Sequence, residues 1–477
     1  MRYITKTDLL IIGLNSGYLL IGIGVMCLIP LLFDLIYFEF DLTSFILPAA
    51  ISIGLGVFLM KYLKKYSKKN LRLKHGMIIS SIGWLWAALI GGLVFMLATN
   101  LSPLDAIFES MSALTGTGIT MYTDLEILPH SVLFFRAFEQ WIGGLGVVVM
   151  VISILTKPGA VTSTLYHSEA HEERVKPSTK TTLEKTIKIY IIYTITGIIL
   201  YILAGMPIFD SLCNTFCIIS TGGMNIKNAN MGYYNNDLIY FITIILMILG
   251  ATSFLVHYKV IKTKGKSLLE DLQFKIIICV IAIVTLLLYY MSNIVPMELL
   301  FTVVSAITTT GANIPSSLTM AGWPSFVLIC LICLMLSGGS NGSTVGAIKL
   351  IRIITFFKGV YKHIREILSP TGRIVPIKLQ DKQLPESVVA QSGNYITLYL
   401  MFILVTWALF CLFGYDPFKS LFAIVSLQGS NGLDLGIMTP QINPILKIVS
   451  IFNMWIGRLE IYPVLITIRT VFEIFKR

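Results

Sequence analysis

Long apolar stretches dominate this sequence. An α-helix needs about 20 mostly apolar residues to cross the roughly 30 Å hydrocarbon core of a bilayer, and runs of that kind recur along the whole chain. Only 13% of the 477 residues are charged, and no soluble domain of ordinary size fits between the runs. The polar stretches 156–187 and 358–392 are predicted to be loops. We predict an all-α polytopic membrane protein with ten spanning segments, at 8–33, 44–64, 76–98, 130–155, 188–206, 237–260, 274–293, 324–357, 393–414 and 444–472.

Lys and Arg fall on one side of this predicted topology. Connections rich in base are 61–74, 157–188, 259–275 and 349–382, which hold seven, six, five and eight Lys or Arg. The connections 34–41, 101–129 and 295–323 hold none. Because basic loops stay on the cytoplasmic side, we predict a multi-pass protein of the cell membrane with both termini cytoplasmic. The net charge of +11 is then explained by the basic cytoplasmic loops, and nucleic acid is not expected as a partner.

Four short apolar segments lie between spans on the outer side, and in each a proline precedes a glycine by 15 residues. The pairs are Pro103 and Gly118, Pro207 and Gly222, Pro296 and Gly311, and Pro417 and Gly432. Proline suits the first turn of a helix, and roughly 11 helical residues cover about 16 Å, half the bilayer. We therefore predict four copies of helix, half-helix, glycine loop and helix around a central pore. The predicted divisions are an N-terminal transmembrane hairpin over 1–70 and pore repeats over 71–160, 161–266, 267–370 and 371–477.

The glycine-containing strings have a composition that favours a monovalent cation. A half-helix entering from outside directs the negative end of its dipole toward the membrane centre, and glycine lets successive carbonyls turn toward one axis and replace a hydration shell. Divalent ions would require carboxylates, which the strings lack. For any single glycine the alternative is close helix packing. The predicted filter residues are Thr117, Gly118, Thr221, Gly222, Thr310, Gly311, Asn431 and Gly432.

A polar, glycine-rich stretch at 337–346 interrupts the second spanning segment of the third repeat. It lacks the apolarity and helix propensity to continue that helix. We predict a break just below the filter that blocks the ion path in one state and withdraws in another; a static kink is the alternative. The predicted gate residues are Gly338, Gly339, Ser340, Asn341, Gly342, Gly346 and Arg458.

Arg458 joins this group because a charge within an apolar helix usually faces a cavity or the interior of the bundle. There it would be an electrostatic barrier to cations. The alternative is a structural pair with Glu460 or with loop carbonyls. Lys349 and Arg352 are expected near the cytoplasmic end of the broken helix, with side chains that reach the membrane interface.

Several strings resemble one known family. The strings at 112–118 (Ser-Ala-Leu-Thr-Gly-Thr-Gly) and 140–146 (Gln-Trp-Ile-Gly-Gly-Leu-Gly) resemble the first pore repeat of the Trk/Ktr/HKT potassium transporter superfamily. Similar strings occupy 222–224, 305–311, 346–352 and 453–460, and the two additional N-terminal helices match its TrkH-like branch. The resemblance implies potassium uptake through a homodimer, with K⁺ as the transported ion, no covalently bound cofactor, and gating by cytoplasmic TrkA-like nucleotide-binding subunits.

Two other classes of protein fit the sequence less well. A secondary transporter coupled to H⁺ or Na⁺ with alternating access would show inverted repeats, whereas these repeats all face the same way. An intramembrane enzyme would need convergent His, Asp or Ser side chains, and the spans hold no such set, so no enzymatic activity is predicted. His167, His171 and Glu172 have helical metal-ligand spacing but lie in a charged loop, where a solvated face is predicted.

Overall fold

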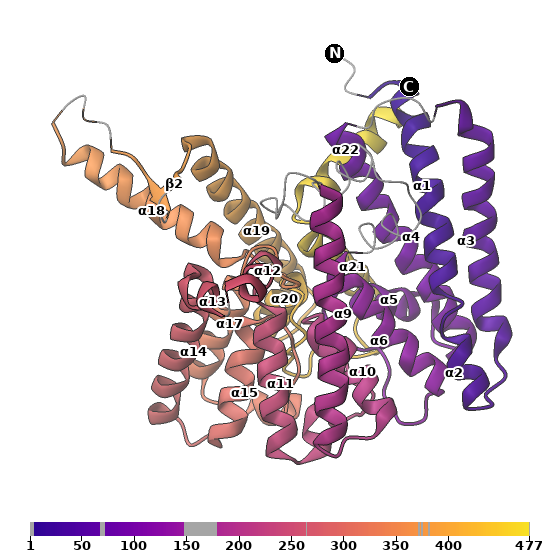
Figure 1. Cartoon of the computed structure of the whole chain (residues 1–477), viewed down its shortest axis with the longest axis horizontal. Helices are drawn as coiled ribbons and strands as arrows, with labels where there is room; N and C mark the ends of the chain where they lie inside the picture. The colour runs from indigo at the N-terminus through magenta and orange to yellow at the C-terminus, as the bar shows by residue number, and fades with distance from the viewer. Residues whose placement is uncertain are drawn as a thin grey trace.

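The computed structural model is built almost entirely of helices. It describes residues 4–66, 72–146, 179–263, 265–370, 373, 375–379 and 382–476. The N-terminal part contains α1 (Lys6–Met26), α2 (Leu31–Ile36), α3 (Leu42–Leu63) and the 3₁₀ turn η1 (Lys64–Tyr66). Figure 1 shows α1 and α3 side by side at one edge, and it places the start of α1 and the end of α22 (Tyr462–Phe475) at the same end of the molecule.

Four units of similar design follow, which we call units 1 to 4. Unit 1 contains α4 (Leu73–Thr99), α5 (Pro103–Thr115) and α6 (His130–Leu145). Unit 2 contains α9 (Thr179–Leu203), α10 (Ile208–Ile219), η2 (Asn230–Tyr234), α11 (Asp237–Gly250) and α12 (Phe254–Thr263), and α13 (Lys266–Glu270) connects it to the next unit. Unit 3 contains α14 (Leu272–Met291), α15 (Pro296–Ile307), α16 (Ser317–Ala321), α17 (Ser325–Ser337) and α18 (Leu350–Ile367). Unit 4 contains α19 (Glu386–Leu412), α20 (Pro417–Gln428), α21 (Pro444–Arg458) and α22.

Each unit contains one short helix with a proline in its first turn or directly before it. Pro103, Pro296 and Pro417 stand in the first turn of α5, α15 and α20, whereas Pro207 is the N-cap residue just before α10. Proline fits both places because neither needs a backbone N–H. These helices have 12 or 13 residues, so at about 1.5 Å per residue they are too short to cross the hydrocarbon core of a bilayer.

The last helix of units 2, 3 and 4 is broken. The axis bends by 104° between α11 and α12 and by 119° between α21 and α22. In unit 3, α17 ends at Ser337 and α18 begins at Leu350, so the helix break predicted for 337–346 is present. Among the described residues of unit 1, α6 ends at Leu145 and Gly146 follows with a positive φ of 92°.

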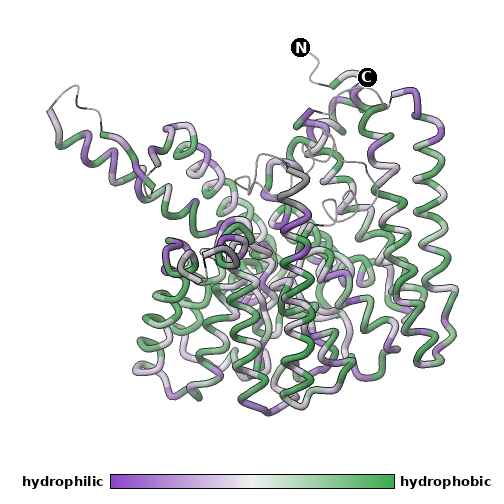
Figure 2. The backbone as a smooth tube through the Cα atoms, viewed as in Figure 1, coloured by the Kyte–Doolittle hydropathy of each residue, from purple (hydrophilic) through white to green (hydrophobic). Residues whose placement is uncertain are grey.

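The apolar helices agree with a multi-pass membrane protein. Among the described residues, six helices are long and apolar enough to cross a membrane, or up to eight if each bent pair forms one span. Figure 2 shows hydrophobic residues along much of these helices. The two other predicted spans, 130–155 and 324–357, differ for separate reasons: residues 147–178 lie outside the described part of the chain, and the polar break divides the second span.

The prediction that 358–392 is a loop was wrong for most of that stretch. Helix α18 continues to Ile367 and α19 already begins at Glu386, while two-residue strands β1 (Lys378–Leu379) and β2 (Lys382–Gln383) pair between them. The polar composition of α18 concealed an amphipathic helix, whose Lys362 bonds Glu366 one turn later over 3.2 Å. The predicted solvated face at His167, His171 and Glu172 lies outside the described residues.

Small residues bring α1 and α3 into close contact. A Cβ added at Gly17 would lie 2.9 Å from the carbonyl oxygen of Gly56, and one added at Gly56 would lie 2.7 Å from that of Gly17. Glycine at both positions lets the two backbones approach, as is common between helices in membranes. The N-terminal hairpin therefore depends on these two glycines for its packing.

Replacing Gly56 by valine should destabilise the hairpin by about 1–3 kcal/mol, the usual effect of overpacking. We expect a lower melting temperature for the purified protein in detergent. Gly54→Val is the matched control, because it lies on the same helix and has no heavy atom within 4 Å of an added Cβ. Equal melting temperatures for the two variants would contradict the close α1–α3 contact.

Candidate ion pathway

Each short helix passes into its loop with the same backbone hydrogen bond. In every unit an amide N–H donates over 2.9 Å to the carbonyl five residues earlier. The donor and acceptor pairs are Thr117 and Ser112, Gly222 and Cys217, Thr310 and Ser305, and Asn431 and Ser426. Positive φ angles flank every donor, at the residue before (Gly116, Thr221, Thr309, Ser430) and at the glycine after (Gly118, Gly223, Gly311, Gly432). The four donor residues are therefore structurally equivalent.

This equivalence corrects the register that the proline spacing predicts for unit 2. The spacing pairs Gly222 with Gly118, but the backbone pairs Gly223 with Gly118 and Gly222 with Thr117. The reason lies at the start of the helix, because Pro207 precedes α10 as its N-cap while the other three prolines are inside the first turn. Counting from proline therefore stops one residue short in unit 2.

The four loops meet in a closed ring. A Cβ added at Gly118 would lie 2.3 Å from the Gly222 carbonyl oxygen, and one at Gly223 would lie 2.0 Å from that of Thr310. A Cβ added at Gly311 would lie 1.8 Å from the Asn431 carbonyl oxygen. One added at Gly432 would lie 2.2 Å from the Thr117 carbonyl oxygen, so the last contact is again with unit 1. We call the oxygens of Thr117, Gly222, Thr310 and Asn431 the ring carbonyls. Each comes from a different unit, and the units follow one another around the ring in chain order.

Glycine is required beside each ring carbonyl for two reasons. The positive φ of these glycines, from 65° at Gly223 to 105° at Gly432, is strained for any residue with a Cβ. A Cβ would also collide with the neighbouring unit's carbonyl at the distances given above. Seven of the eight predicted filter residues thus belong to the ring or stand directly after it, while Thr221 precedes it with a φ of 53°.

The residues of the ring itself are polar or glycine and carry no formal charge. The ring carbonyls follow the C-terminal ends of α5, α10, α15 and α20 by two or three residues, and such ends carry partial negative charge. Thr117 and Thr310 are fully buried, and their hydroxyls pair with those of Thr115 and Thr308 at 2.9 and 2.8 Å. An arrangement of neutral oxygens near helix C-termini favours a monovalent cation.

A buried ion pair that sequence reasoning missed supports two of the loops. The carboxylate of Glu109 on α5 accepts from Arg136 Nε on α6 and from the backbone N–H of Met121, at 2.8 and 2.7 Å. Arg136 also donates through Nη1 to the Asn225 carbonyl over 2.9 Å. The pair therefore connects the loop of unit 1 to the loop of unit 2. Charged residues within apolar segments were the available signal.

The polar break of unit 3 lies directly against the ring. The hydroxyl of Thr344 is 2.9 Å from that of Thr221, and the N–H of Gly346 donates to the Thr309 hydroxyl over 3.1 Å. The N–H of Ser340 donates over 3.0 Å to the carbonyl of Ala251, at the bend between α11 and α12. The stretch 338–346 thus packs under units 2 and 3. Sequence reasoning included its glycines but missed Thr344.

Arg458 holds this stretch in place. Its Nη1 donates to the Thr344 carbonyl over 2.7 Å, and its Nη2 donates to the carbonyls of Gly143 and Gly144 at 2.6 and 3.1 Å. Of the alternatives considered for Arg458, pairing with loop carbonyls is therefore present in the structure. The guanidinium connects unit 4 to the break of unit 3 and to α6 of unit 1.

The side chains of Lys349 and Arg352, expected to extend toward the membrane interface, both bind one buried carboxylate. Lys349 Nζ binds Glu460 Oε1 over 2.8 Å, and Arg352 binds the other carboxylate oxygen of the same residue. Glu460 is 5% exposed and lies between α21 and α22. A buried carboxylate at the bend draws both cations inward, because charges removed from water are stabilised by pairing.

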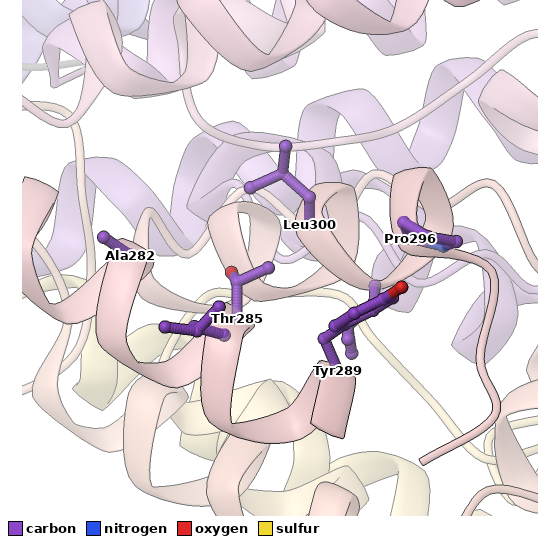
Figure 3. Close-up of a pocket in the computed structure, with 7 residues that line it drawn as sticks. Ala282, Thr285, Tyr289, Pro296 and Leu300 are labelled. Atoms are coloured by element: carbon purple, nitrogen blue, oxygen red, sulfur yellow. The ribbon is translucent and has the colours of Figure 1, made fainter. Parts of the chain in front are cut away.

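A separate groove of about 450 Å³ lies between α14 and the start of α15. Figure 3 shows Thr285 and Tyr289 on one side of it and Pro296 and Leu300 on the other. Its lining contains no charged side chain, and the neighbouring Leu286 is 58% exposed on a strongly apolar helix. The groove is therefore unsuited to an ion route.

Comparison with known proteins finds relatives that are named as transporters. A family model described as TrkH, a cation transport protein, matches residues 48–295 and 294–474. An uncharacterized cation transporter of Methanocaldococcus jannaschii is 36% identical over 98% of this chain and 97% of its own length. The Trk system potassium uptake protein TrkH of Salmonella typhimurium is 29% identical, over 94% of this chain and 96% of its own.

A solved structure shares the fold. The crystal structure of the potassium transporter TrkH from Vibrio parahaemolyticus superposes with a TM-score of 0.84 at 27% identity, over 96% of this chain and 98% of that chain. The family model covers nearly the whole sequence, and the described helices agree with a solved relative along their length. The chain belongs to the TrkH family of cation transport proteins.

Proposed function

We propose that the chain is the pore subunit of a potassium uptake system and that K⁺ crosses it passively through the ring carbonyls. The observation that carries this proposal is the closed contact of four equivalent carbonyls, one from each unit. Oxygens arranged in this way can replace the hydration shell of an alkali ion. The helix C-termini behind them add negative potential.

The names of the relatives support K⁺ as the ion. The Salmonella typhimurium relative is named a potassium uptake protein, and the Vibrio parahaemolyticus structure is titled a potassium transporter. An ion-coupled transporter with alternating access would place its site between inverted halves. Four units that direct equivalent carbonyls to one ring favour a channel-like pore instead.

The stretch 338–346 serves as the gate in this proposal. Thr344 stands next to Thr221, directly behind a ring carbonyl, and Arg458 fixes it through a charge-assisted hydrogen bond to its carbonyl. A guanidinium beside the route also repels cations. In the open state the stretch would move away and the Arg458 contacts would break.

The expected partners are a second copy of the chain and cytoplasmic regulatory subunits. The family resemblance implies both, and the exposed surface of α18 supports the first. We expect a homodimer, cytoplasmic TrkA-like nucleotide-binding subunits that control the gate, and both termini in the cytoplasm. Helix α18 projects from one side of the molecule (Figure 1) and carries an apolar stripe at helical spacing. Its members are Phe357, Tyr361, Ile364 and Leu368, which are 64, 60, 50 and 80% exposed. A stripe of this kind suits a second copy of the chain.

Gly311→Ala should abolish the preference for K⁺ over Na⁺, because the added Cβ would lie 1.8 Å from the Asn431 ring carbonyl. The measurement is Rb⁺ and Na⁺ uptake into proteoliposomes. Gly414→Ala is the matched control, since Gly414 also has a positive φ, of 83°, but no heavy atom within 4 Å. An unchanged ion preference in Gly311→Ala would count against the ring as the filter.

Arg458→Ala should raise flux through the isolated pore subunit severalfold, since it removes three hydrogen bonds that hold Thr344 and the unit 1 helix end. The ion preference should stay the same because the ring is not touched. Arg469→Ala, on the last helix and 67% exposed in its side chain, is the control. A pore that stays equally closed would remove the gate assignment.

Replacing Phe357 and Ile364 together by aspartate should convert the protein from dimer to monomer, because two charges would enter the apolar stripe. Light scattering of the detergent-purified protein gives the mass. Leu318→Asp, at an 80% exposed position on α16, controls for the loss of an exposed apolar side chain. A dimer that persists in the double variant would place the interface elsewhere.

A further inference from the structure

Unit 2 differs from the other units at the ring itself. The ring residue is Thr117, Thr310 or Asn431 in units 1, 3 and 4, but Gly222 in unit 2. Backbone geometry does not demand this glycine, because the positive φ angles of unit 2 belong to Thr221 and Gly223 and not to Gly222. Something other than backbone conformation therefore keeps a side chain out of this position.

The side chain of Gln140 fills the vacant space. A Cβ added at Gly222 would lie 2.1 Å from Cδ, 2.3 Å from Cγ and 2.4 Å from Nε2 of Gln140. Gln140 stands on α6 of unit 1 and is fully buried. Gln140 thus occupies the space that a side chain at position 222 would enter.

The Gln140 carboxamide also makes one contact that the ring side chain of unit 4, Asn431, makes in its own loop. Its Oε1 accepts from the Met224 N–H over 3.0 Å, as Asn431 Oδ1 in unit 4 accepts from the Leu433 N–H over 3.3 Å. Met224 and Leu433 both lie two residues after the ring. Since a backbone N–H can only donate, it fixes Oε1 toward Met224 and leaves Nε2 to donate to the Gly222 carbonyl, at 2.8 Å.

This hydrogen bond makes one ring carbonyl unlike the other three. In the described part of the chain, the Gly222 oxygen is the one ring carbonyl that accepts a protein hydrogen bond. A donor behind a carbonyl fixes its direction and draws on the electron density that it offers a cation. The ring is therefore asymmetric, and a residue of unit 1 donates a hydrogen bond to the ring carbonyl of unit 2.

We propose that Gln140 is a positioning residue that supplies from unit 1 the ring side chain missing in unit 2, and that it tunes ion selectivity through the Gly222 carbonyl. The inference rests on the proposed K⁺ function. It predicts that a carboxamide is needed in this space, and that the side chain supplying it can be attached at position 140 or at position 222.

The test is a double-mutant cycle of Gln140→Ala and Gly222→Asn, with the K⁺ to Na⁺ flux ratio in proteoliposomes as the readout. Gln140→Ala should lower the ratio about three- to tenfold, the effect of one hydrogen bond of ordinary net strength. Gly222→Asn should also perform poorly, because its side chain collides with Gln140. The double variant should exceed both single variants, since asparagine at 222 then fills the space that alanine at 140 leaves.

Gln428→Ala is the matched control for the loss of a buried glutamine. Gln428 is fully buried on α20, and its Nε2 donates over 2.9 Å to the Tyr399 carbonyl of α19, which is not a ring carbonyl. Its flux ratio should equal that of the wild type even if its melting temperature falls. A merely structural role of Gln140 would give the two alanine variants the same behaviour.

The outcomes separate this inference from the proposed function. A wild-type protein without preference for K⁺ would refute the proposed function itself. A selective wild type with an unchanged ratio in Gln140→Ala would overturn only the role of Gln140. If Gln140→Ala cannot be purified, the double variant decides: recovered yield with K⁺ preference supports the proposal, and a double variant no better than the singles overturns it.

Discussion

The structure depends on where it places the backbone carbonyls that have no hydrogen-bond partner within a helix. Hydrocarbon offers no hydrogen bonds, so such carbonyls are tolerated only where protein or a watery path surrounds them. Four short helices end near one axis, and beyond each end a carbonyl turns toward the neighbouring unit's glycine. Closing this ring needs four glycines at positive φ, and every other feature of the pathway is arranged around it.

Much of this arrangement could be predicted from local sequence signals. Proline and glycine act on the backbone within a few residues, so their spacing indicated the short helices, and the polarity of 337–346 indicated the break that follows α17. The register of unit 2 could not be read in the same way, because Pro207 precedes its helix whereas the other three prolines stand in the first turn. Only the hydrogen-bond pattern shows that Gly223 is the counterpart of Gly118.

The features that the sequence did not predict arise from contacts between residues far apart in the chain. Gln140 and Gly222 are separated by 82 positions, Thr344 and Thr221 by 123, and Lys349 and Glu460 by 111. A single sequence carries no signal for such pairs, because helix periodicity and propensity describe each segment alone. Helix α18 differs for a local reason: its polar composition suggested a loop, whereas its apolar residues follow a helical spacing.

The proposed gate is held by a few hydrogen bonds and ion pairs, and residues on both sides of it have strained backbone. Ala347 and Lys349 after the break, and Glu460 and Ile461 at the α21–α22 bend, all have positive φ from 59° to 74° without being glycine, a conformation that stores strain. Lys349 and Arg352 at the start of α18 bind Glu460, two residues after the Arg458 that holds Thr344. Helix α18 is therefore linked to the stretch 338–346 through Glu460 and, two residues earlier, Arg458. In the proposed opening, release of this strain would offset part of the hydrogen bonding that is lost.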